Sequence, residues 1–115
     1  MLRIHREREL GYISDDAIDT PHCFTTRTGG VSAGAFSTLN LGVGGGDGEA
    51  NVVENCRRAC GLLDAQPEDT VFARQVHGDN VRAVTEADRG KGLFLERDYE
   101  ADALVTDMPG IVPAY

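Results

Sequence analysis

The sequence is poor in lysine and in long hydrophobic runs, and each shortage excludes a class of partner. Lys91 is the only lysine, and 19 acidic residues outnumber 11 basic ones, giving a formal net charge of −8. General nucleic-acid binding relies on clustered lysine and arginine, so nucleic acid is not an expected partner. No stretch approaches the roughly 18 apolar residues that span a bilayer, and residues 1–9 are too charged for a secretory signal. We therefore expect no membrane partner and a cytoplasmic location.

Cysteine is also sparse, and its three copies predict reduced thiols rather than a disulfide framework. Cys56 and Cys60 stand four residues apart, so on a helix they share a face, and with a histidine nearby they could bind zinc. The favoured interpretation is that both pack as small hydrophobic side chains on that helix. A nucleophilic Cys–His pair would need Cys23 beside His22, or a cysteine beside His77 in space, and nothing in the spacing favours either.

Motifs for a serine nucleophile and for nucleotide binding are missing as well. No Gly-x-Ser-x-Gly nucleophile elbow occurs. Most of the 14 glycines lie between Gly29 and Gly48, which predicts a long loop that is either a linker or wraps a ligand. Leu39 and Leu41 give this loop apolar side chains of its own, which makes a linker the weaker interpretation. Asp47 stands where a dinucleotide fingerprint needs glycine, and no lysine follows as a P-loop requires, so a plain loop is favoured over a nucleotide loop.

The remaining pattern predicts one domain over residues 1–115 with an α+β fold, a mixed β-sheet with flanking helices. Asp47 is expected to cap a helix that Gly61 ends, with Asn55 away from its buried stripe. The buried stripe is predicted to consist of Val52, Cys56, Ala59, Cys60 and Leu63. Residues 80–85 are expected to form a hairpin arm. Strands are predicted at residues 10–13, 22–27, 70–77, 80–85, 101–107 and 111–115.

His77 is the best single candidate for chemistry. It ends a predicted strand and is followed by Gly78 and the turn-forming pair Asp79-Asn80, so its imidazole could point into a pocket while the backbone bends away. On spacing alone, a satisfied and partly buried histidine is the favoured interpretation, because one histidine makes no site. Arg27 and Arg74 lie at strand ends and could clamp an anion, although surface salt bridges are the favoured alternative for both.

Six short motifs are more specific together than any one of them alone. They are HCFTTRTGGVS at residues 22–32, LNLG at 39–42, GD at 46–47, VEN at 53–55, ARQVHG at 73–78 and ADALVTD at 101–107. In wording, order and spacing they resemble the YfiH-type laccase-domain family of purine nucleoside phosphorylases. The resemblance covers Pro21–Tyr115.

The resemblance implies a zinc-associated enzyme that cleaves purine nucleosides with phosphate and also deaminates adenosine. An older label for the family is polyphenol oxidase with copper. His77 matches a histidine that is a metal ligand in the family and is therefore the implied catalytic residue. A cysteine in an Ala-Asp-Cys motif and a later histidine complete the ligand set in the family, and both are expected beyond Tyr115. The resemblance therefore implies the N-terminal portion of a laccase-domain fold, incomplete at the C-terminus.

For substrate contacts we select Arg27, Arg74 and Asn40, because arginine can grip a phosphate and asparagine can bond a ribose hydroxyl. Two alternatives stay open. One is a truncated, non-catalytic domain that folds or self-associates through the strand at residues 111–115, which ends without cap, charge or tail. The other is a copper-dependent polyphenol oxidase, which is weaker because the whole chain has three histidines.

Overall fold

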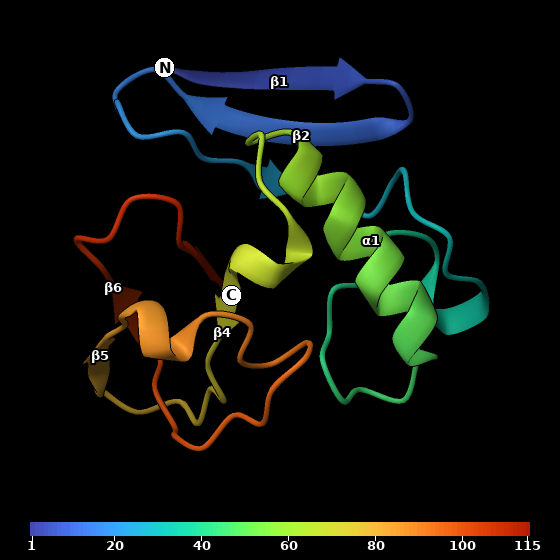
Figure 1. The fold of residues 1–115 in the computed structure, drawn as a ribbon. Helices are drawn as coiled ribbons and strands as arrows, with labels where there is room; N and C mark the ends of the chain where they lie inside the picture. Colours follow the sequence, from blue (N-terminus) through green and yellow to red (C-terminus); the bar gives the residue numbers. More distant parts are fainter. The chain divides into compact units, whose positions relative to one another are not determined.

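The computed structural model describes all residues, 1–115, as two compact units. One unit covers Met1–Asp64 and the other Ala65–Tyr115, and each is described by itself. Seven strands and one α-helix confirm the predicted mixture of helix and sheet (Figure 1). Three short 3₁₀ helices complete the structure. The prediction of a single domain over residues 1–115 stays a prediction.

The first unit begins with a three-stranded antiparallel sheet in the order β1-β2-β3. Strands β1 (Leu2–Glu7) and β2 (Leu10–Asp15) form a hairpin in which Glu7 pairs with Leu10. Arg8, in the two-residue turn, takes the positive φ of 56° that tight hairpins demand. The strand predicted at residues 10–13 is confirmed, whereas the predicted strand at 22–27 is reduced to β3 (Phe24–Thr25). Strand β1 lies within the charged residues 1–9, where the sequence pattern predicts no strand.

Helix α1 (Glu49–Gly61) buries one face against its unit. Cys56 and Cys60 are buried, as the simpler interpretation of these cysteines predicts. The predicted cap is wrong by one residue, since Gly48 occupies the N-cap position and the Asp47 carboxylate is hydrogen-bonded by loop side chains instead. The buried residues of the helix are Val52, Asn55, Cys56, Ala59 and Cys60.

Glu54 on α1 makes the stability of this unit sensitive to acid. Hydrogen bonds from the Arg57 and Arg58 side chains lower the pKa of Glu54 from 4.5 to about 2. Since its folded-state pKa lies below its unfolded value, Glu54 stabilises the fold above pH 4.5, and this contribution is lost as the pH falls toward 2.

We expect Glu54→Gln to flatten the pH dependence of stability between about pH 4.5 and pH 2. Urea unfolding followed by circular dichroism at several pH values measures this slope. Glu49→Gln removes the same charge from the first turn of the helix and serves as the control, which should keep the wild-type slope. Equal slopes in Glu54→Gln and wild type would contradict the assignment.

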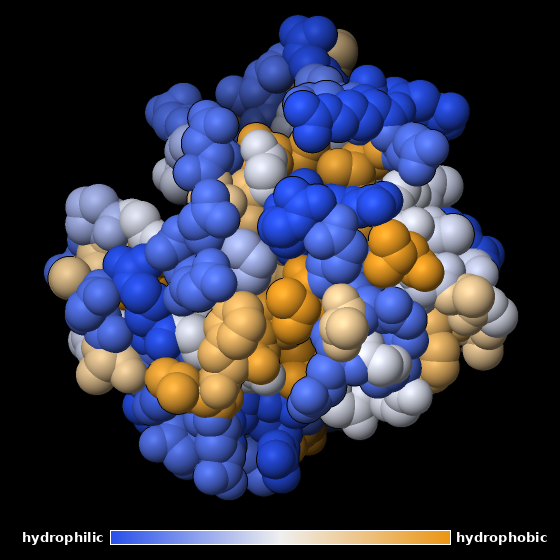
Figure 2. All heavy atoms as spheres, turned by 45° about the vertical axis from the view of Figure 1, so that its right-hand side comes forward, coloured by the Kyte–Doolittle hydropathy of each residue, from blue (hydrophilic) through white to orange (hydrophobic).

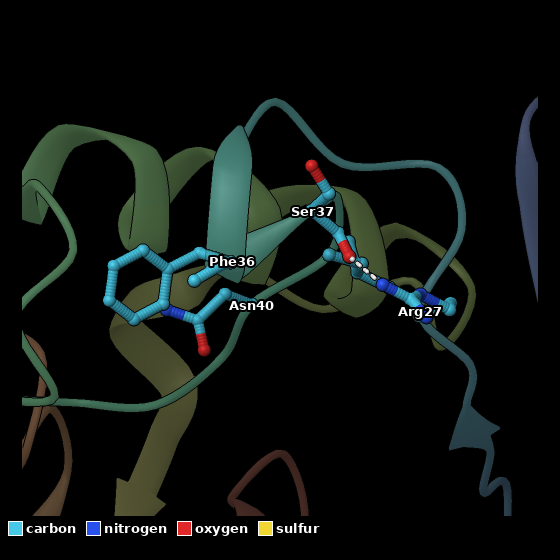
Figure 3. A pocket seen from close by; sticks show the side chains of 6 residues that line it. Arg27, Phe36, Ser37 and Asn40 are labelled. Atoms are coloured by element: carbon cyan, nitrogen blue, oxygen red, sulfur yellow. Dashed lines mark hydrogen bonds between the residues drawn. The ribbon is translucent and has the colours of Figure 1, made fainter.

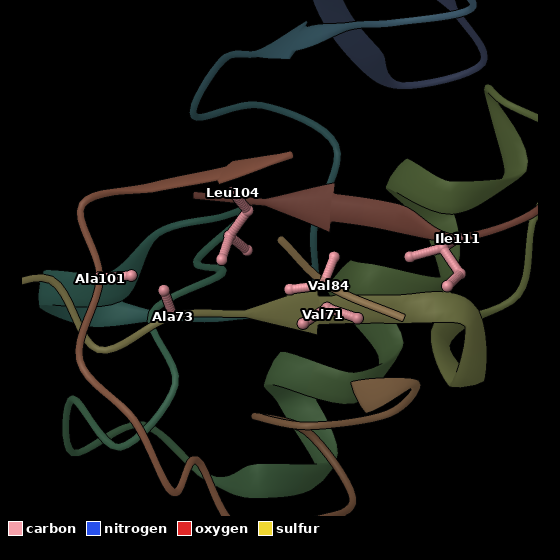
Figure 4. Close-up of a cluster of buried hydrophobic side chains, with 6 residues drawn as sticks. All are labelled: Val71, Ala73, Val84, Ala101, Leu104 and Ile111. Carbon is pink, nitrogen blue, oxygen red and sulfur yellow. The ribbon is translucent and has the colours of Figure 1, made fainter. Parts of the chain in front are cut away.

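The second unit contains two parallel strand pairs. Strand β4 (Thr70–Phe72) pairs with β7 (Val112–Ala114), and β5 (Val81–Ala83) pairs with β6 (Ala103–Val105). The predicted hairpin arm at residues 80–85 is therefore wrong in its pairing. Residues 84–102 supply the long crossover that a parallel pair needs. The buried core of this unit is a cluster of six side chains, Val71, Ala73, Val84, Ala101, Leu104 and Ile111 (Figure 4).

The surface mixes hydrophilic residues with scattered hydrophobic ones, as the face drawn in Figure 2 shows. Exposed large hydrophobic residues include Ile4 on β1, Phe24 on β3 and Val81 on β5. Scattered exposure of this kind is usual for proteins and needs no functional explanation. Helix α1 lacks the length and the hydrophobicity of a membrane-spanning helix.

Candidate functional site

Two of the predicted substrate residues, Arg27 and Asn40, line one cavity in the first unit. The cavity measures about 310 Å³ and is open to solvent. Figure 3 shows the Phe36 ring and the Asn40 amide beside the loop, and the Arg27 guanidinium reaching toward Ser37. The cavity wall thus includes an arginine, a phenylalanine and an asparagine. The complete lining is Arg27, Ala35, Phe36, Ser37, Leu39 and Asn40.

The backbone of Arg27 ties the end of β3 to the glycine-rich loop. Its carbonyl oxygen accepts hydrogen bonds from the backbone N–H groups of Thr38 and Leu39, at 2.9 and 3.0 Å. Its Nη2 atom donates to the Ser37 carbonyl at 3.2 Å. Because one side-chain bond uses only part of a guanidinium with five N–H donors, the exposed remainder can still bind an anion.

The Asp47 carboxylate organises the far end of this loop. It accepts hydrogen bonds from Ser32 Oγ at 2.5 Å and from the side-chain amides of Asn40 and Asn51, each at 3.2 Å. The Ser32 hydroxyl is the largest cause of the lowered pKa of Asp47. The carboxylate therefore stays ionised and acts as an anchor for Asn40.

Asn55 on α1 belongs to the same hydrogen-bond network as Ser32, Asn40 and Asp47. It is fully buried, and its Oδ1 accepts from the Val31 N–H at 2.8 Å. Its Nδ2 donates to Ser32 Oγ and to the Asn40 carbonyl, both at 2.9 Å. The prediction that Asn55 lies away from the buried face is wrong, because its side chain faces the loop and satisfies backbone groups of Val31 and Asn40. Helical spacing from Val52 is the signal that could have found it.

His77 lies in the second unit, on an exposed turn instead of at a strand end. Strand β4 stops at Phe72, and residues 74–80 are all exposed. His77 has a φ of 58°, in the left-handed region that non-glycine residues seldom occupy. The strand predicted at residues 70–77 is therefore confirmed only over Thr70–Phe72, and an exposed turn replaces its second half.

Asp102 holds the His77 turn, and sequence reasoning missed it. Its Oδ1 accepts hydrogen bonds from the Val76 and His77 backbone N–H groups, both at 2.9 Å, and its Oδ2 accepts from Gly78 at 2.8 Å. The Gly78 N–H is the largest cause of the lowered pKa of Asp102. Its place in the ADALVTD motif was the one available signal, since no local pattern links residues so far apart.

Arg74 lies at the start of the same turn, exposed to solvent. Its carbonyl oxygen accepts the Ala101 N–H at 3.1 Å, which anchors the backbone and leaves the side chain outside this contact. The second unit therefore carries His77 and Arg74, and the first carries Arg27 and Asn40.

The residues present do not by themselves fit a zinc site. Structural and catalytic zinc sites use three or four protein ligands, and no group of three or more histidine, cysteine or acidic side chains converges in this chain. Cys56 Sγ and Cys60 Sγ lie 3.8 Å apart on α1, both buried. His77 belongs to no group of three or more such side chains, so no chemical step is derived through a metal here.

Comparison with known proteins places these motifs in a family. The model of the family described as multi-copper polyphenol oxidoreductase laccase matches residues 21–115. The purine nucleoside phosphorylase YlmD of Geobacillus stearothermophilus is 40% identical over 92 residues, covering 78% of this chain and 34% of the relative. A purine nucleoside phosphorylase of Deinococcus radiodurans is 40% identical over 94 residues, covering 82% of this chain and 33% of the relative.

Two solved structures share the fold. The crystal structure of YlmD from Geobacillus stearothermophilus aligns with a TM-score of 0.79 at 32% identity, covering 96% of this chain and 42% of that one. The Bacillus licheniformis hypothetical protein YfiH aligns with a TM-score of 0.69 at 36% identity, covering 79% and 35%. The chain spans about a third of the length of the curated relatives it matches. Because the family model matches well over half of its residues, the chain belongs to the multi-copper polyphenol oxidoreductase laccase family.

Proposed function

We propose that this chain serves purine nucleoside phosphorolysis, the cleavage of a nucleoside by phosphate that its relatives' names describe. The observation that carries the proposal is the meeting of Arg27 and Asn40 in one cavity, beside Phe36. A purine nucleoside offers a flat base and ribose hydroxyls, and the co-substrate phosphate is an anion. The three side chains match these three chemical features.

Arg27 is the proposed phosphate contact. Its guanidinium can bind two phosphate oxygens through parallel N–H groups, since the bond to Ser37 uses one donor. Phosphorolysis needs phosphate aligned with the anomeric carbon and needs charge stabilised as the glycosidic bond breaks. A fixed cation at the cavity wall supplies both.

Asn40 is the proposed ribose contact, and its amide is only partly used by the loop. Nδ2 donates one N–H to Asp47, and Oδ1 accepts one bond from the Gly42 N–H at 3.0 Å. A second N–H and a second lone pair remain for a hydroxyl group. Phe36 can stack on the purine, an interaction that aromatic rings make with any base.

His77 is the proposed catalytic residue and metal ligand, and Arg74 a further substrate contact. Zinc is the proposed metal, with copper as the alternative suggested by the family description. A metal held by His77 would need further ligands, since no group of three or more histidine, cysteine or acidic side chains converges in this chain. We also propose that the protein deaminates adenosine and lies in the cytoplasm.

The test is to incubate the chain with inosine or adenosine, phosphate and zinc, and to follow release of the free base by chromatography. In parallel, amide chemical shifts of the cavity residues are recorded while inosine and inorganic phosphate are added separately. We expect shifts at Arg27, Phe36 and Asn40. Base release by the full-length Geobacillus stearothermophilus relative serves as the positive control.

We expect Arg27→Ala to weaken phosphate binding about tenfold, because a hydrogen bond between charged partners contributes about 1.5 kcal/mol or more. Arg3→Ala removes another exposed arginine, from β1, and should bind phosphate as the wild type does. Phosphate binding that is equal in Arg27→Ala and wild type would remove the cavity from the proposal. Absence of both base release and ligand-induced shifts would overturn the proposal as a whole.

The family description favours a second candidate, oxidation of phenols with copper. Loading the chain with copper and following oxidation of a phenol by absorbance tests it directly.

A third proposal, self-association through the C-terminal strand, concerns β7, which pairs with β4 alone within its sheet. Pro113 lacks a backbone N–H and so weakens β7 as a pairing edge. Sedimentation at several concentrations decides this point.

A further inference from the structure

Residues 101 and 102 contact both ends of the His77 turn, which covers residues 74–80. The Ala101 N–H donates to the Arg74 carbonyl at 3.1 Å, and the Asp102 N–H donates to the Asn80 carbonyl at 3.0 Å. These two backbone bonds hold the two ends of the turn. Between these two ends, the Asp102 carboxylate accepts hydrogen bonds from the backbone N–H groups of residues 76–78.

The turn needs such a partner for two physical reasons. Three successive N–H groups that point to one side form a concave site for an anion, and each needs an acceptor. In addition, the left-handed φ of His77 is unfavourable for a residue with a side chain, and it persists only where neighbouring contacts fix it. One carboxylate meets both needs, because it accepts the His77 N–H together with both adjacent ones.

We propose that Asp102 is a positioning residue that fixes the left-handed turn at His77 and so presents the imidazole in one defined orientation. The catalytic role of that imidazole rests on the proposed function, whereas the fixing of the turn rests on the contacts of Asp102 alone. The Asp102 carboxylate acts through the backbone N–H groups of the turn.

Hydrogen exchange of individual amides, measured by NMR on the whole chain, tests this proposal. In Asp102→Ala we expect the amides of Val76, His77 and Gly78 to exchange about tenfold faster or more, because each loses a charged acceptor. The three-bond coupling between the His77 amide and its Hα, which reports φ, should move away from its wild-type value. The amides of residues 101 and 102 should stay protected, since their acceptors are backbone carbonyls.

Two variants act as matched controls. Asp102→Asn keeps a neutral Oδ1 acceptor for Val76 and His77 and loses the Oδ2 acceptor, so exchange should accelerate more at Gly78 than at Val76 and His77. Asp107→Asn removes the same charge from the exposed end of the same motif and should change none of the three amides. Should Asp102→Ala be too unstable to measure, the selective effect in Asp102→Asn still decides the question.

Unchanged exchange at residues 76–78 in Asp102→Ala, together with an unchanged His77 coupling, would overturn the proposal. A general acceleration that includes residues 101 and 102 would also overturn it, since that pattern reports loss of structure instead of loss of positioning. The measurement needs no nucleoside, so failure of base release with the expected exchange pattern contradicts only the proposed function.

Discussion

Replacing Asn55 with alanine is expected to lower the free energy of unfolding by about 3 kcal/mol or more. The side chain is fully buried and makes three hydrogen bonds, to the Val31 N–H, the Ser32 hydroxyl and the Asn40 carbonyl. Each buried polar group left without a partner costs about 1–3 kcal/mol. Since whole domains are stable by only about 5–15 kcal/mol, this single change removes a large share of the total.

Urea unfolding followed by the helical circular dichroism signal measures this loss, because α1 is the only α-helix. Asn51→Ala is the matched control: Asn51 lies one turn earlier, is half-buried, and makes one side-chain bond, to Asp47 at 3.2 Å. We expect the control to lose less than about 1 kcal/mol. If both variants lose equal stability, the buried network is not what holds the loop to the helix.

Asn55 also shows why the sequence predicts helices better than it predicts polar cores. The helix itself follows from its apolar spacing, and Asn55 sits three residues after the buried Val52 and four before the buried Ala59. Geometry alone places it on the buried face, whereas its polar side chain argues for exposure. The folded glycine-rich loop resolves this conflict, because its backbone groups at Val31 and Asn40 form hydrogen bonds with the buried Asn55 side chain.

The candidate site also contains residues that the sequence identifies and residues that only the fold brings into place. Side-chain chemistry selected Arg27 and Asn40, which line one cavity, whereas the places of Phe36 and Asp47 around it depend on how the loop folds. Asp102 meets the turn at His77 across 25 residues of sequence. Contacts at that distance depend on topology, and a periodicity of two or of 3.6 residues carries no information about them.

Parallel pairing is the other feature that spacing left undetermined. Strand β5 was expected in a hairpin because its residues alternate, yet alternation is the same for parallel and antiparallel partners. The long segment between β5 and β6 permits the parallel pair, and that segment needs fixing of its own. Asp88, within this segment, accepts hydrogen bonds from Arg82, Thr85 and Lys91.

Asp88→Ala is expected to destabilise the second unit by about 3–5 kcal/mol, the usual cost of removing one partner of a buried ion pair. Asp88 is 4% exposed, and its Oδ1 accepts from Lys91 Nζ at 2.8 Å and from Arg82 Nη2 at 3.2 Å. Its Oδ2 accepts the Thr85 N–H at 3.0 Å, which closes a 3₁₀ helix at Glu86–Asp88. Without the carboxylate, Lys91 and Arg82 both lose the acceptor that they share, and the Lys91 side chain is only 14% exposed.

The cations have only partial substitutes for Asp88. Lys91 Nζ also lies 3.0 Å from Asp98, whose side chain is largely exposed, and the Arg82 guanidinium stacks 3.8 Å from the centre of the Tyr99 ring. Arg82 Nε is buried without a hydrogen-bond partner, so this arginine already depends on its Nη2 contact. An exposed ion pair of the Lys91–Asp98 kind contributes only about 0–1 kcal/mol.

Acid should produce part of the same loss. Burial alone raises the pKa of Asp88, but hydrogen bonds from Lys91, Thr85 and Arg82 outweigh it, so the pKa lies below its usual range. A lowered folded-state pKa means that Asp88 stabilises the unit above the ordinary aspartate pKa, about 3.9, and that this contribution disappears as the pH falls through its folded-state value. The pH dependence of stability should therefore be shallower in Asp88→Asn.

Amide exchange of Val84, whose N–H donates to the Val105 carbonyl at 2.8 Å, reports the stability of this unit. Under conditions where exchange follows global opening, a loss of 3–5 kcal/mol corresponds to exchange about a hundredfold faster or more. Asp98→Ala removes the exposed carboxylate from the same lysine and should change the exchange of Val84 by less than about tenfold. Equal acceleration in Asp88→Ala and Asp98→Ala would show that burial of the carboxylate adds nothing, and the crossover between β5 and β6 would then be held by its apolar contacts alone.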